Sequence, residues 1–193
     1  MRKGVSDEGR KIILSMLEEN PKARFLDLGC SIGDFTIEIA KKIRTSKIFG
    51  VDETEYINSR IPIYIADLNK GVPFGDEEFD IVVASQVIEH LWKPQVFLRE
   101  IYRVLKPTGN AIISTPNLAA WHNVLYLILG KQPEPAKVSD EMYPEHEKPG
   151  HLRIFTKSEL LKLLEFHGFR IEKVVGSGYI LGRPSTITVK VRK

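Results

Sequence analysis

The 193-residue sequence predicts an α/β protein with a doubly wound sheet of seven strands, mostly parallel with an antiparallel last strand. Two observations favour this fold class. Short apolar runs of strand length alternate with segments whose apolar residues recur at helical spacing. One run, Asp80–Ala84 (DIVVA), is continuously apolar after its first residue, as expected for a strand buried on both faces of a parallel sheet.

The expected elements follow in order along the chain. Strands are predicted at residues 25–28, 47–51, 62–66, 80–84, 110–115, 170–175 and 186–191. Helices are predicted over residues 6–19, from Asp34, from Pro94 and after Thr156. Their start signals are a Ser6 or Asp7 cap, a proline at a first helical position, and the capping box Thr156-Lys-Ser-Glu159.

Three connections complete the expected topology. Only 15 positions (67 − 52) separate Asp52 from Asp67, too few for a crossover helix plus a strand, so ETEYINSRIPI is predicted to be a loop. Lys106–Gly109 is predicted to be a turn into the fifth strand. Asn117–Arg153 is unusually long, and such loops are usually functional or disordered. Its apolar first half, LAAWHNVLYLIL, predicts a helix that is either core or part of a lid over an acceptor site.

Composition narrows the function classes. Lys plus Arg number 28 against 25 Asp plus Glu, a near-balance that argues neither for nor against an anionic partner. Because no basic stripe or appended binding module is present, methylation of nucleic acid is the weaker option. A single cysteine excludes an internal disulfide and indicates a reducing compartment. No apolar run approaches the ~20 residues of a membrane span, and the first residues lack a signal-peptide core. The sequence predicts one cytoplasmic domain over residues 1–193.

Gly29-Cys30-Ser31-Ile32-Gly33 reads literally as G-x-S-x-G, the nucleophile elbow of serine hydrolases. The motif follows the first strand, however, so no earlier loop can complete an oxyanion hole. A Walker loop is also excluded, because no Gly-Lys-Ser/Thr follows. The dinucleotide fingerprint would require glycine at positions 31 and 34, where the chain has Ser31 and Asp34.

Acidic residues favour a different ligand. Asp27, Asp52 and Asp67 end the first three strands, at the edge where open α/β sheets bind ligands, and Asp34 opens the next helix. A pyrophosphate would be repelled there, by about 4 kcal/mol per pair of unit charges at about 4 Å and a dielectric of about 20. Asp52 lies 19 positions (52 − 33) past Gly33, near the spacing of a ribose-binding acid. The pattern favours S-adenosylmethionine, which carries positive charge and hydroxyls but no phosphate.

The ordered set of motifs resembles the class I S-adenosylmethionine-dependent methyltransferases, type 11 group, whose fold is Rossmann-like. The resemblance covers about residues 22–175. It rests on FLDLGCSIG, IFGVD, YIADLNKGVPFGDEEFDIVVASQVIEHL, LREIYRVLKPTGNAIISTPN and HLRIFTKSELLKLLEFHGF. It implies S-adenosyl-L-methionine as the cofactor.

The resemblance also implies the roles of individual residues. Gly29, Cys30 and Gly33 would form the turn under the methionine moiety, and Asp27 would orient that turn or face the ammonium. The family usually has glycine where this chain has Ser31. Asp52 would accept hydrogen bonds from both ribose hydroxyls, and Asp67 would accept one from the adenine amine. The Leu68 backbone would contact the adenine ring. Ser85 and Gln86 would lie beside the sulfonium.

Methyl transfer from a sulfonium needs alignment and exclusion of water more than covalent catalysis. A base is needed only if the acceptor arrives protonated, and His90 in VIEHL and His151 in HLRIF are the candidates. Each also has a structural alternative, since His90 could hold its loop and His151 could anchor the long segment. No metal site is predicted, because the histidines and glutamates of residues 122–151 show no recognisable ligand spacing.

Two functions of different classes remain. The first is an enzyme that methylates a small-molecule or lipid-like acceptor. The second is a regulatory or partner protein that binds S-adenosylmethionine without methyl transfer. Residues 115–133 followed by HLRIFT are similar to a methionine-biosynthesis subgroup whose members associate with homoserine acyltransferase. A protein partner or a homodimer is compatible with either function.

Overall fold

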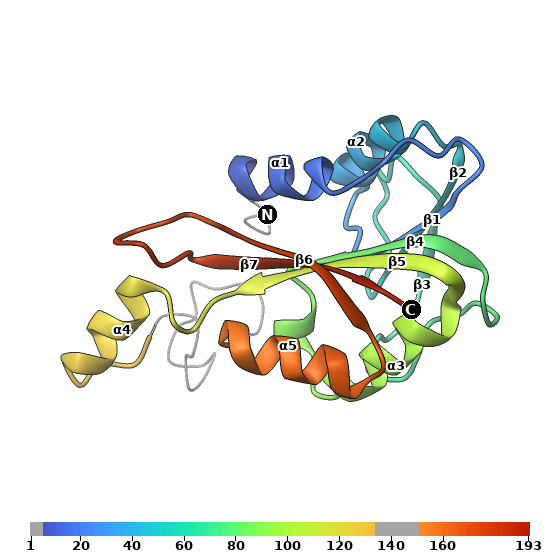
Figure 1. The fold of residues 1–193 in the computed structure, drawn as a ribbon. Helices are drawn as coiled ribbons and strands as arrows, with labels where there is room; N and C mark the ends of the chain where they lie inside the picture. The colour runs from blue at the N-terminus through green and yellow to red at the C-terminus, as the bar shows by residue number, and fades with distance from the viewer. Residues whose placement is uncertain (1–5, 134–150) are drawn as a thin grey trace.

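The computed structural model describes residues 6–133 and 151–193 (Figure 1). Their seven strands form one sheet in the order β3-β2-β1-β4-β5-β7-β6. Strands β3, β2, β1, β4 and β5 pair in parallel, whereas β7 runs antiparallel to both β5 and β6. The predicted doubly wound, mostly parallel sheet is therefore confirmed.

All seven predicted strands are present, with small shifts at their ends. Their bounds are β1 Arg24–Leu28, β2 Lys47–Asp52, β3 Ile63–Ile65, β4 Phe79–Ser85, β5 Leu105–Pro116, β6 Arg170–Ser177 and β7 Thr186–Arg192. One prediction was wrong, because Lys106–Gly109 lies inside β5 and does not form a separate turn. Leu105 already pairs with Phe79, and the next β4–β5 pair is Ile81 with Asn110, so the extra β5 residues form an irregularity within the ladder.

The predicted helices begin where their capping signals indicate. Helix α1 spans Asp7–Ser15, and the Ser6 hydroxyl accepts a hydrogen bond from Gly9 N at 3.1 Å. The α1 helix ends before residue 19, the predicted end. Helix α5 spans Lys157–Phe166, and Thr156 Oγ1 accepts from Glu159 N at 3.3 Å. The others are α2 Asp34–Ile43, the 3-10 turn η1 Ile88–His90, α3 Pro94–Val104 and α4 Trp121–Ile128.

Two layers of helices cover the sheet. Helices α1 and α2 lie on one face, and α3 and α5 lie on the other (Figure 1). Along β4, Ile81 and Val83 pack on the α1–α2 side, whereas Val82 and Ala84 pack on the α3–α5 side. All four side chains are buried, which confirms that β4 is covered on both faces.

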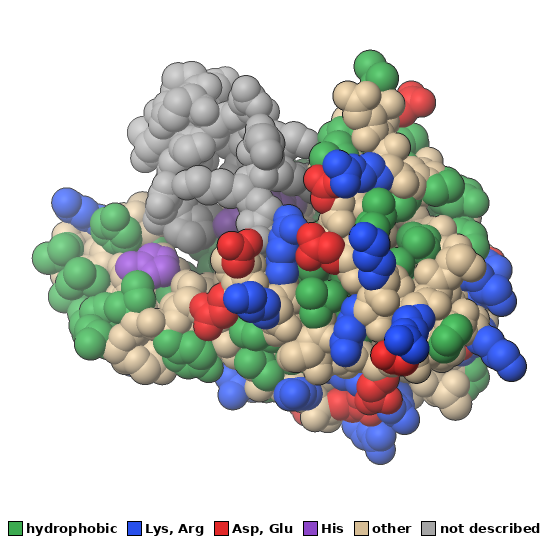
Figure 2. All heavy atoms as spheres, turned by 90° about the horizontal axis from the view of Figure 1, so that it is seen from above, with side chains coloured by type: hydrophobic (Ala, Val, Ile, Leu, Met, Phe, Trp, Pro, Cys, Tyr) green, Lys and Arg blue, Asp and Glu red, His purple; other side chains and the backbone are tan. Residues whose placement is uncertain are grey.

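Helix α4 lies outside these layers, beyond the end of β5 (Figure 1). Among its residues only Asn123 is buried, and its amide donates to the carbonyl of Asn117 at 2.9 Å. The apolar side chains of residues 125–129 are exposed, and Figure 2 shows hydrophobic side chains gathered at this end of the molecule. The predicted helix is therefore present, but its apolar residues are not core. Residues 134–150 of the predicted lid lie outside the described residues.

None of the helices in the described part of the chain has the length and apolar character needed to cross a membrane.

Candidate active site

The turn after β1 lies where the strand order reverses, with β2 on one side of β1 and β4 on the other. Ligands of open α/β sheets bind at this point, outside the carboxyl ends of the strands. Leu28 pairs with Val51 and with Ala84, so the next residues, Asp52 and Ser85, lie level with Gly29. The fold therefore brings the ends of β1 and β2 together, as the acidic residues predicted, and adds the end of β4, as the family resemblance implied.

Two glycines in this turn occupy positions where any other residue would be strained. Gly29 and Gly33 have φ of 75° and 87°, a left-handed conformation that side chains disfavour. A Cβ on Gly29 would lie 2.5 Å from Val87 Cγ2, and one on Gly33 would lie 2.7 Å from Ile61 Cγ1. The amides of Gly29 and Cys30 also donate to Val51 O at 2.8 and 3.2 Å. The turn is tightly packed and fixed to β2.

Ser31, between the two glycines, is also left-handed, with φ of 52°. Its amide donates to Asp52 Oδ2 at 2.9 Å. Among the described residues, no base is hydrogen-bonded to the Ser31 hydroxyl. The nucleophile elbow therefore has no catalytic partner in this part of the chain.

Asp27 is 5% exposed at the end of β1 and accepts a hydrogen bond from Thr36 Oγ1 at 2.6 Å. Burial raises the pKa of Asp27 to about 7, against the lowering effect of the Thr36 hydrogen bond and with a smaller contribution from the charge of Asp52. A cation beside this carboxyl would favour its charged form. Thr36, which the sequence analysis did not single out, lies in the first turn of α2 and holds the carboxyl in place.

Asp52 is 1% exposed, and both of its carboxylate oxygens already accept backbone hydrogen bonds. Oδ2 accepts from Ser31 N, and Oδ1 accepts from Thr54 N at 3.2 Å. Each oxygen can accept a second donor, so the carboxylate keeps hydrogen-bonding capacity. In this structure Asp52 fixes the glycine turn to β2.

The connection between β2 and β3 is a loop, as predicted, and it packs over the glycine turn. Ile61 is buried against Gly33 and Gly50. Arg60 N donates to Ile32 O at 2.9 Å, and the Arg60 guanidinium lies 3.0 Å from an Asp34 oxygen. The loop thus takes the place of a crossover helix as the outer support of the turn.

Asp67 and Leu68 follow β3 and differ in exposure. The Asp67 side chain is 43% exposed and lies 3.3 Å from Lys70. It accepts from Asn69 N at 2.9 Å and Asn69 Nδ2 at 3.0 Å, and these bonds, the backbone one first, lower its pKa. Leu68 is buried in the core cluster under α3 and α5. Asp67 is therefore ionised at neutral pH at an accessible position.

Ser85 and Gln86 leave the end of β4 and are tied to β5 by Ser114. The Ser85 and Ser114 hydroxyl oxygens lie 2.7 Å apart, and Gln86 Nε2 donates to Ser114 Oγ at 3.4 Å. Gln86 has φ of 57°, and its amide donates to Ser114 O at 2.9 Å. Ser114 was missed by sequence reasoning because nothing in its local sequence marks it.

Cys30 is buried, with its sulfur packed against Gly50. Burial, followed by the charges of Asp27 and Asp52, raises the pKa of the Cys30 thiol far above its usual range. The thiol is therefore a packing group and not a nucleophile.

His90 and His151 were predicted separately as bases, and the fold places them side by side. Their ring centroids lie 4.8 Å apart at an interplanar angle of 72°. Burial lowers the pKa of His151 below its usual value, so its imidazole is neutral at neutral pH. Glu89 lies in the same cluster and was not singled out by the sequence analysis.

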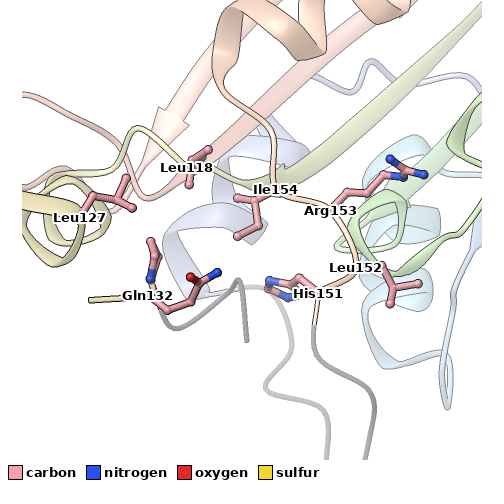
Figure 3. A pocket seen from close by; sticks show the side chains of 8 residues that line it. Leu118, Leu127, Gln132, His151, Leu152, Arg153 and Ile154 are labelled. Carbon is pink, nitrogen blue, oxygen red and sulfur yellow. The ribbon is translucent and has the colours of Figure 1, made fainter. Parts of the chain in front are cut away.

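A cavity of about 450 Å³ opens beside His151. Figure 3 shows Gln132 and His151 pointing toward each other across the opening, with Leu118, Leu127 and Ile154 along one side. These residues come from the two ends of the long connection between β5 and α5. The cavity offers an apolar wall with a few polar groups, the usual character of a site for an organic ligand.

Comparisons with known proteins agree with this architecture. Residues 1–174 match a methyltransferase domain family. A probable S-adenosylmethionine-dependent methyltransferase of Mycolicibacterium smegmatis is 30% identical over 162 residues, which are 78% of this chain and 53% of that protein. The human mitochondrial ubiquinone biosynthesis O-methyltransferase is 28% identical over 171 residues, covering 81% of this chain and 44% of that protein. The chain spans about half the length of these relatives.

Solved structures share the fold. An S-adenosylmethionine-dependent methyltransferase from Mesorhizobium loti superposes with a TM-score of 0.76 at 20% identity, covering 98% of this chain and all of that one. The 1,6-didemethyltoxoflavin-N1-methyltransferase of Burkholderia thailandensis, solved with S-adenosylhomocysteine, gives 0.67 at 18% identity, covering 97% and 80%. The predictions of a methyltransferase and of its cofactor are thus confirmed at the level of the family. This chain belongs to the methyltransferase domain family.

Proposed function

We propose that this chain is an enzyme that transfers the methyl group of S-adenosylmethionine to a small-molecule or lipid-like acceptor by direct in-line attack. One observation carries the proposal. Two buried carboxylates, Asp27 and Asp52, flank a turn of left-handed residues at the point where the strand order reverses. That arrangement suits a cofactor with an ammonium, a sulfonium and ribose hydroxyls, and it disfavours one with phosphates.

The residues around the turn then have distinct proposed roles. Asp27 faces the ammonium of the cofactor, and Asp52 accepts the ribose hydroxyls with the hydrogen-bonding capacity that its backbone partners leave. The backbone of Gly29, Cys30 and Gly33 lies under the methionine moiety. Asp67 and Leu68 contact the adenine, and Ser85 and Gln86 lie beside the sulfonium.

The acceptor site is proposed at the cavity beside His151. Its apolar wall of Leu118, Leu127 and Ile154 suits the carbon skeleton of an organic acceptor. The exposed apolar residues of α4 continue from this cavity through Leu127, which belongs to both. A lipid-like chain on the acceptor would find apolar surface there, and the segment 117–153 is proposed as the acceptor-binding insertion of a single domain over residues 1–193.

The reaction needs one bond exchange. A lone pair of the acceptor forms the new bond to the methyl carbon as the carbon–sulfur bond breaks, and its electron pair returns to sulfur as a neutral thioether. If the acceptor atom is a hydroxyl oxygen, its proton must leave to solvent or a base. His151 lines the proposed acceptor cavity, and the His90 ring packs against it, so these two imidazoles are the proposed bases.

Calorimetric titration tests the cofactor site. S-adenosylmethionine and S-adenosylhomocysteine should bind, whereas NAD should bind far more weakly. Asp27→Asn should weaken S-adenosylmethionine binding by about 1.5–3 kcal/mol, the range for hydrogen bonds to charged groups. Asp34→Asn, which removes an exposed carboxylate of the first turn of α2 that is paired with Arg60, is the control and should change little. Tight NAD binding, or equal effects of both variants, would contradict the proposal.

Transfer of a labelled methyl group tests the acceptor class. Hydroxylated aromatic compounds with and without a long alkyl chain form a suitable pair of probes. We expect the alkylated member to be methylated more efficiently, because its chain can contact the apolar wall of the cavity. Preference for the compound without the chain would restrict the acceptor to small polar molecules.

The second hypothesis, a partner protein of an acyltransferase, stays a prediction. The exposed apolar side chains of α4 are the feature that favours it, since such surfaces also bind proteins. Stable co-purification with an acyltransferase, together with no methyl transfer to any acceptor, would support it over the enzyme.

A further inference from the structure

Glu89, His90 and His151 form a cluster of potential metal ligands next to the proposed acceptor cavity. Their ligand atoms all lie within 4.8 Å of one another. We propose that these three residues bind a divalent transition-metal ion, with Zn²⁺ as the best fit, and that the ion binds the acceptor hydroxyl. The metal site stands on its own geometry, whereas the ion's role in catalysis rests on the proposed function.

The cluster is held together by backbone hydrogen bonds across a long sequence separation. Glu89 and His90 lie in η1, just after β4, and His151 follows 61 positions (151 − 90) later. The amides of Leu152 and Arg153 both donate to Glu89 O, at 2.9 and 3.1 Å. Because these are backbone bonds, they hold the chain at His151 next to η1 independently of the His151 side-chain conformation. The backbone therefore brings the three potential ligands together.

The ligand types match a known preference. Two imidazoles and one carboxylate are the protein ligands of many catalytic zinc sites, which leave a further position open for water or substrate. Tetrahedral geometry with bonds of about 2.0–2.1 Å would separate the ligand atoms by about 3.3 Å. The present spread of up to 4.8 Å would therefore contract by rotations of the side chains as the ion binds.

One buried polar atom of the cluster points to a bound ligand. The Glu89 side chain is completely buried, and its Oε2 accepts from Thr115 Oγ1 at 3.0 Å. His151 Nδ1 is also buried and has no hydrogen-bond partner in the described ranges. A metal ion would supply a bond for a His151 nitrogen, and the hydrogen bond from Thr115 would orient the Glu89 carboxylate toward the ion.

Hydrogen bonds of two neighbouring β5 residues, Ser114 and Thr115, connect the cluster to the proposed reaction site. Thr115 follows Ser114 in β5, and Ser114 bonds to Ser85 and Gln86, which are proposed to lie beside the sulfonium. His151 lines the cavity proposed for the acceptor. An ion held there would bind an acceptor hydroxyl at its open position and lower its pKa. The released proton would pass to water, and the oxygen lone pair would attack the methyl carbon.

Metal binding is tested first, on the untagged 193-residue chain after treatment with a chelator. Titration with Co²⁺ should give one bound ion per chain and the visible absorption of a site with nitrogen and oxygen ligands, and Zn²⁺ should displace it. His90→Ala and His151→Ala should each weaken Co²⁺ binding at least tenfold. His122→Ala, on α4 and outside the cluster, is the matched control and should bind Co²⁺ as the unaltered chain does.

Glu89→Gln is informative only where it folds, because Glu89 is buried, so thermal unfolding is recorded for every variant. The two histidine variants, whose side chains are half-buried, decide the outcome. Absence of Co²⁺ binding to the unaltered chain would overturn the site. Co²⁺ binding that the His90 and His151 variants leave unchanged, or that His122→Ala weakens equally, would also overturn it.

The ion's catalytic role is tested separately from the proposed function. S-adenosylmethionine binding is measured in the same chelated samples and should be unchanged, since the cofactor contacts lie elsewhere. Methyl transfer to a hydroxylated acceptor should fall at least tenfold on chelation and return with Zn²⁺, but should not return in His151→Ala. Unchanged transfer after chelation would refute the role of the ion. A bound metal with no transfer to any acceptor would refute the proposed function and leave the metal site standing.

Discussion

The glycine turn after β1 and the apolar helix α4 lie at the same carboxyl edge of the sheet but are built differently. Around the turn, Asp27 and Asp52 are buried, and a Cβ on Gly29 would collide with Val87 at 2.5 Å. Around α4, the Ile128 side chain is 71% exposed, and a Cβ on Gly130 would meet nothing within 4 Å. The glycine turn is closely packed, whereas the side chains of α4 make few contacts with the rest of the chain.

This difference matches the two tasks proposed for the two regions. A cofactor of fixed shape requires a rigid site, because displaced hydrogen-bonding groups lose affinity and alignment. An acceptor site that contributes little to the core can change its side chains at small cost to the fold. We therefore expect substitution of the buried carboxyl of Asp27 to alter stability and cofactor binding together, and substitutions on α4 to alter neither.

The largest expected effect concerns the buried carboxyl of Asp27. Its folded pKa, about 7, lies above the ordinary value of 3.8, so its contribution to stability is fully present below pH 3.8 and is lost as pH rises toward 7. A shift of about three units corresponds to about 4 kcal/mol. Asp27→Asn keeps an acceptor for Thr36 and has no charge to bury. Relative to the unaltered chain, it should therefore gain about 4 kcal/mol of unfolding free energy between pH 4 and pH 7.

Urea denaturation of both proteins across this pH range measures the difference. Parallel stability curves would show that Asp27 does not carry a raised pKa in the folded chain. Such a result would also break the contrast between the two regions, since it would mean that water reaches the turn.

The second effect compares one left-handed glycine from each region, Gly29 at the turn and Gly130 after α4. Gly29→Ala should cost about 3 kcal/mol of unfolding free energy, from about 1–2 for the left-handed backbone and a further 1–3 for the overlap with Val87. Gly130→Ala has a similar φ, 67°, but no overlap, and should cost only about 1 kcal/mol. Chemical denaturation gives both values, and equal costs would mean that Val87 moves aside freely.

Much of this architecture follows from local sequence signals. The strands, the helix caps of Ser6 and Thr156, and the short β2–β3 loop were predicted because period, capping residues and spacing are properties of neighbouring residues. The start of β5 was misjudged because Lys106–Gly109 has turn-forming residues that the β4–β5 pairing incorporates as an irregularity. In that case, tertiary contact overrode local preference.

Local sequence signals predicted only part of the candidate site. The ends of β1, β2 and β4 were correctly brought together, because topology alone aligns the ends of parallel strands. The meeting of Glu89 with His151 depends on backbone bonds between segments about 60 residues apart, and no spacing rule describes it. Likewise, the exposure of α4 could not be predicted, since an apolar helix has the same pattern whether it is covered or exposed.

A smaller effect is expected at Ser31, which has a left-handed backbone without being glycine. Ser31→Gly should relieve about 1–2 kcal/mol of strain and lose about 0.5–1 kcal/mol through the greater freedom of the unfolded chain. The net gain should be about 0.5–1 kcal/mol, with cofactor binding intact. Ser31→Ala should remain folded and bind the cofactor as before. Labelling of Ser31 by a fluorophosphonate probe would instead restore the hydrolase hypothesis.

The smallest effect on stability is expected for substitutions on α4. This prediction tests most directly the difference between the glycine turn and α4. Ile128→Gln should change the unfolding free energy by less than about 0.5 kcal/mol, because the side chain is largely exposed and loses few contacts. The same change should raise the KM of an alkylated acceptor severalfold while leaving S-adenosylmethionine affinity unchanged. Phe166→Gln, at the exposed end of α5, removes a similar apolar surface elsewhere and should affect neither quantity. If Ile128→Gln instead destabilises the chain by 2 kcal/mol or more, about the value of a buried side chain, then α4 is covered in solution. Its apolar face would then be an internal contact and not an acceptor surface.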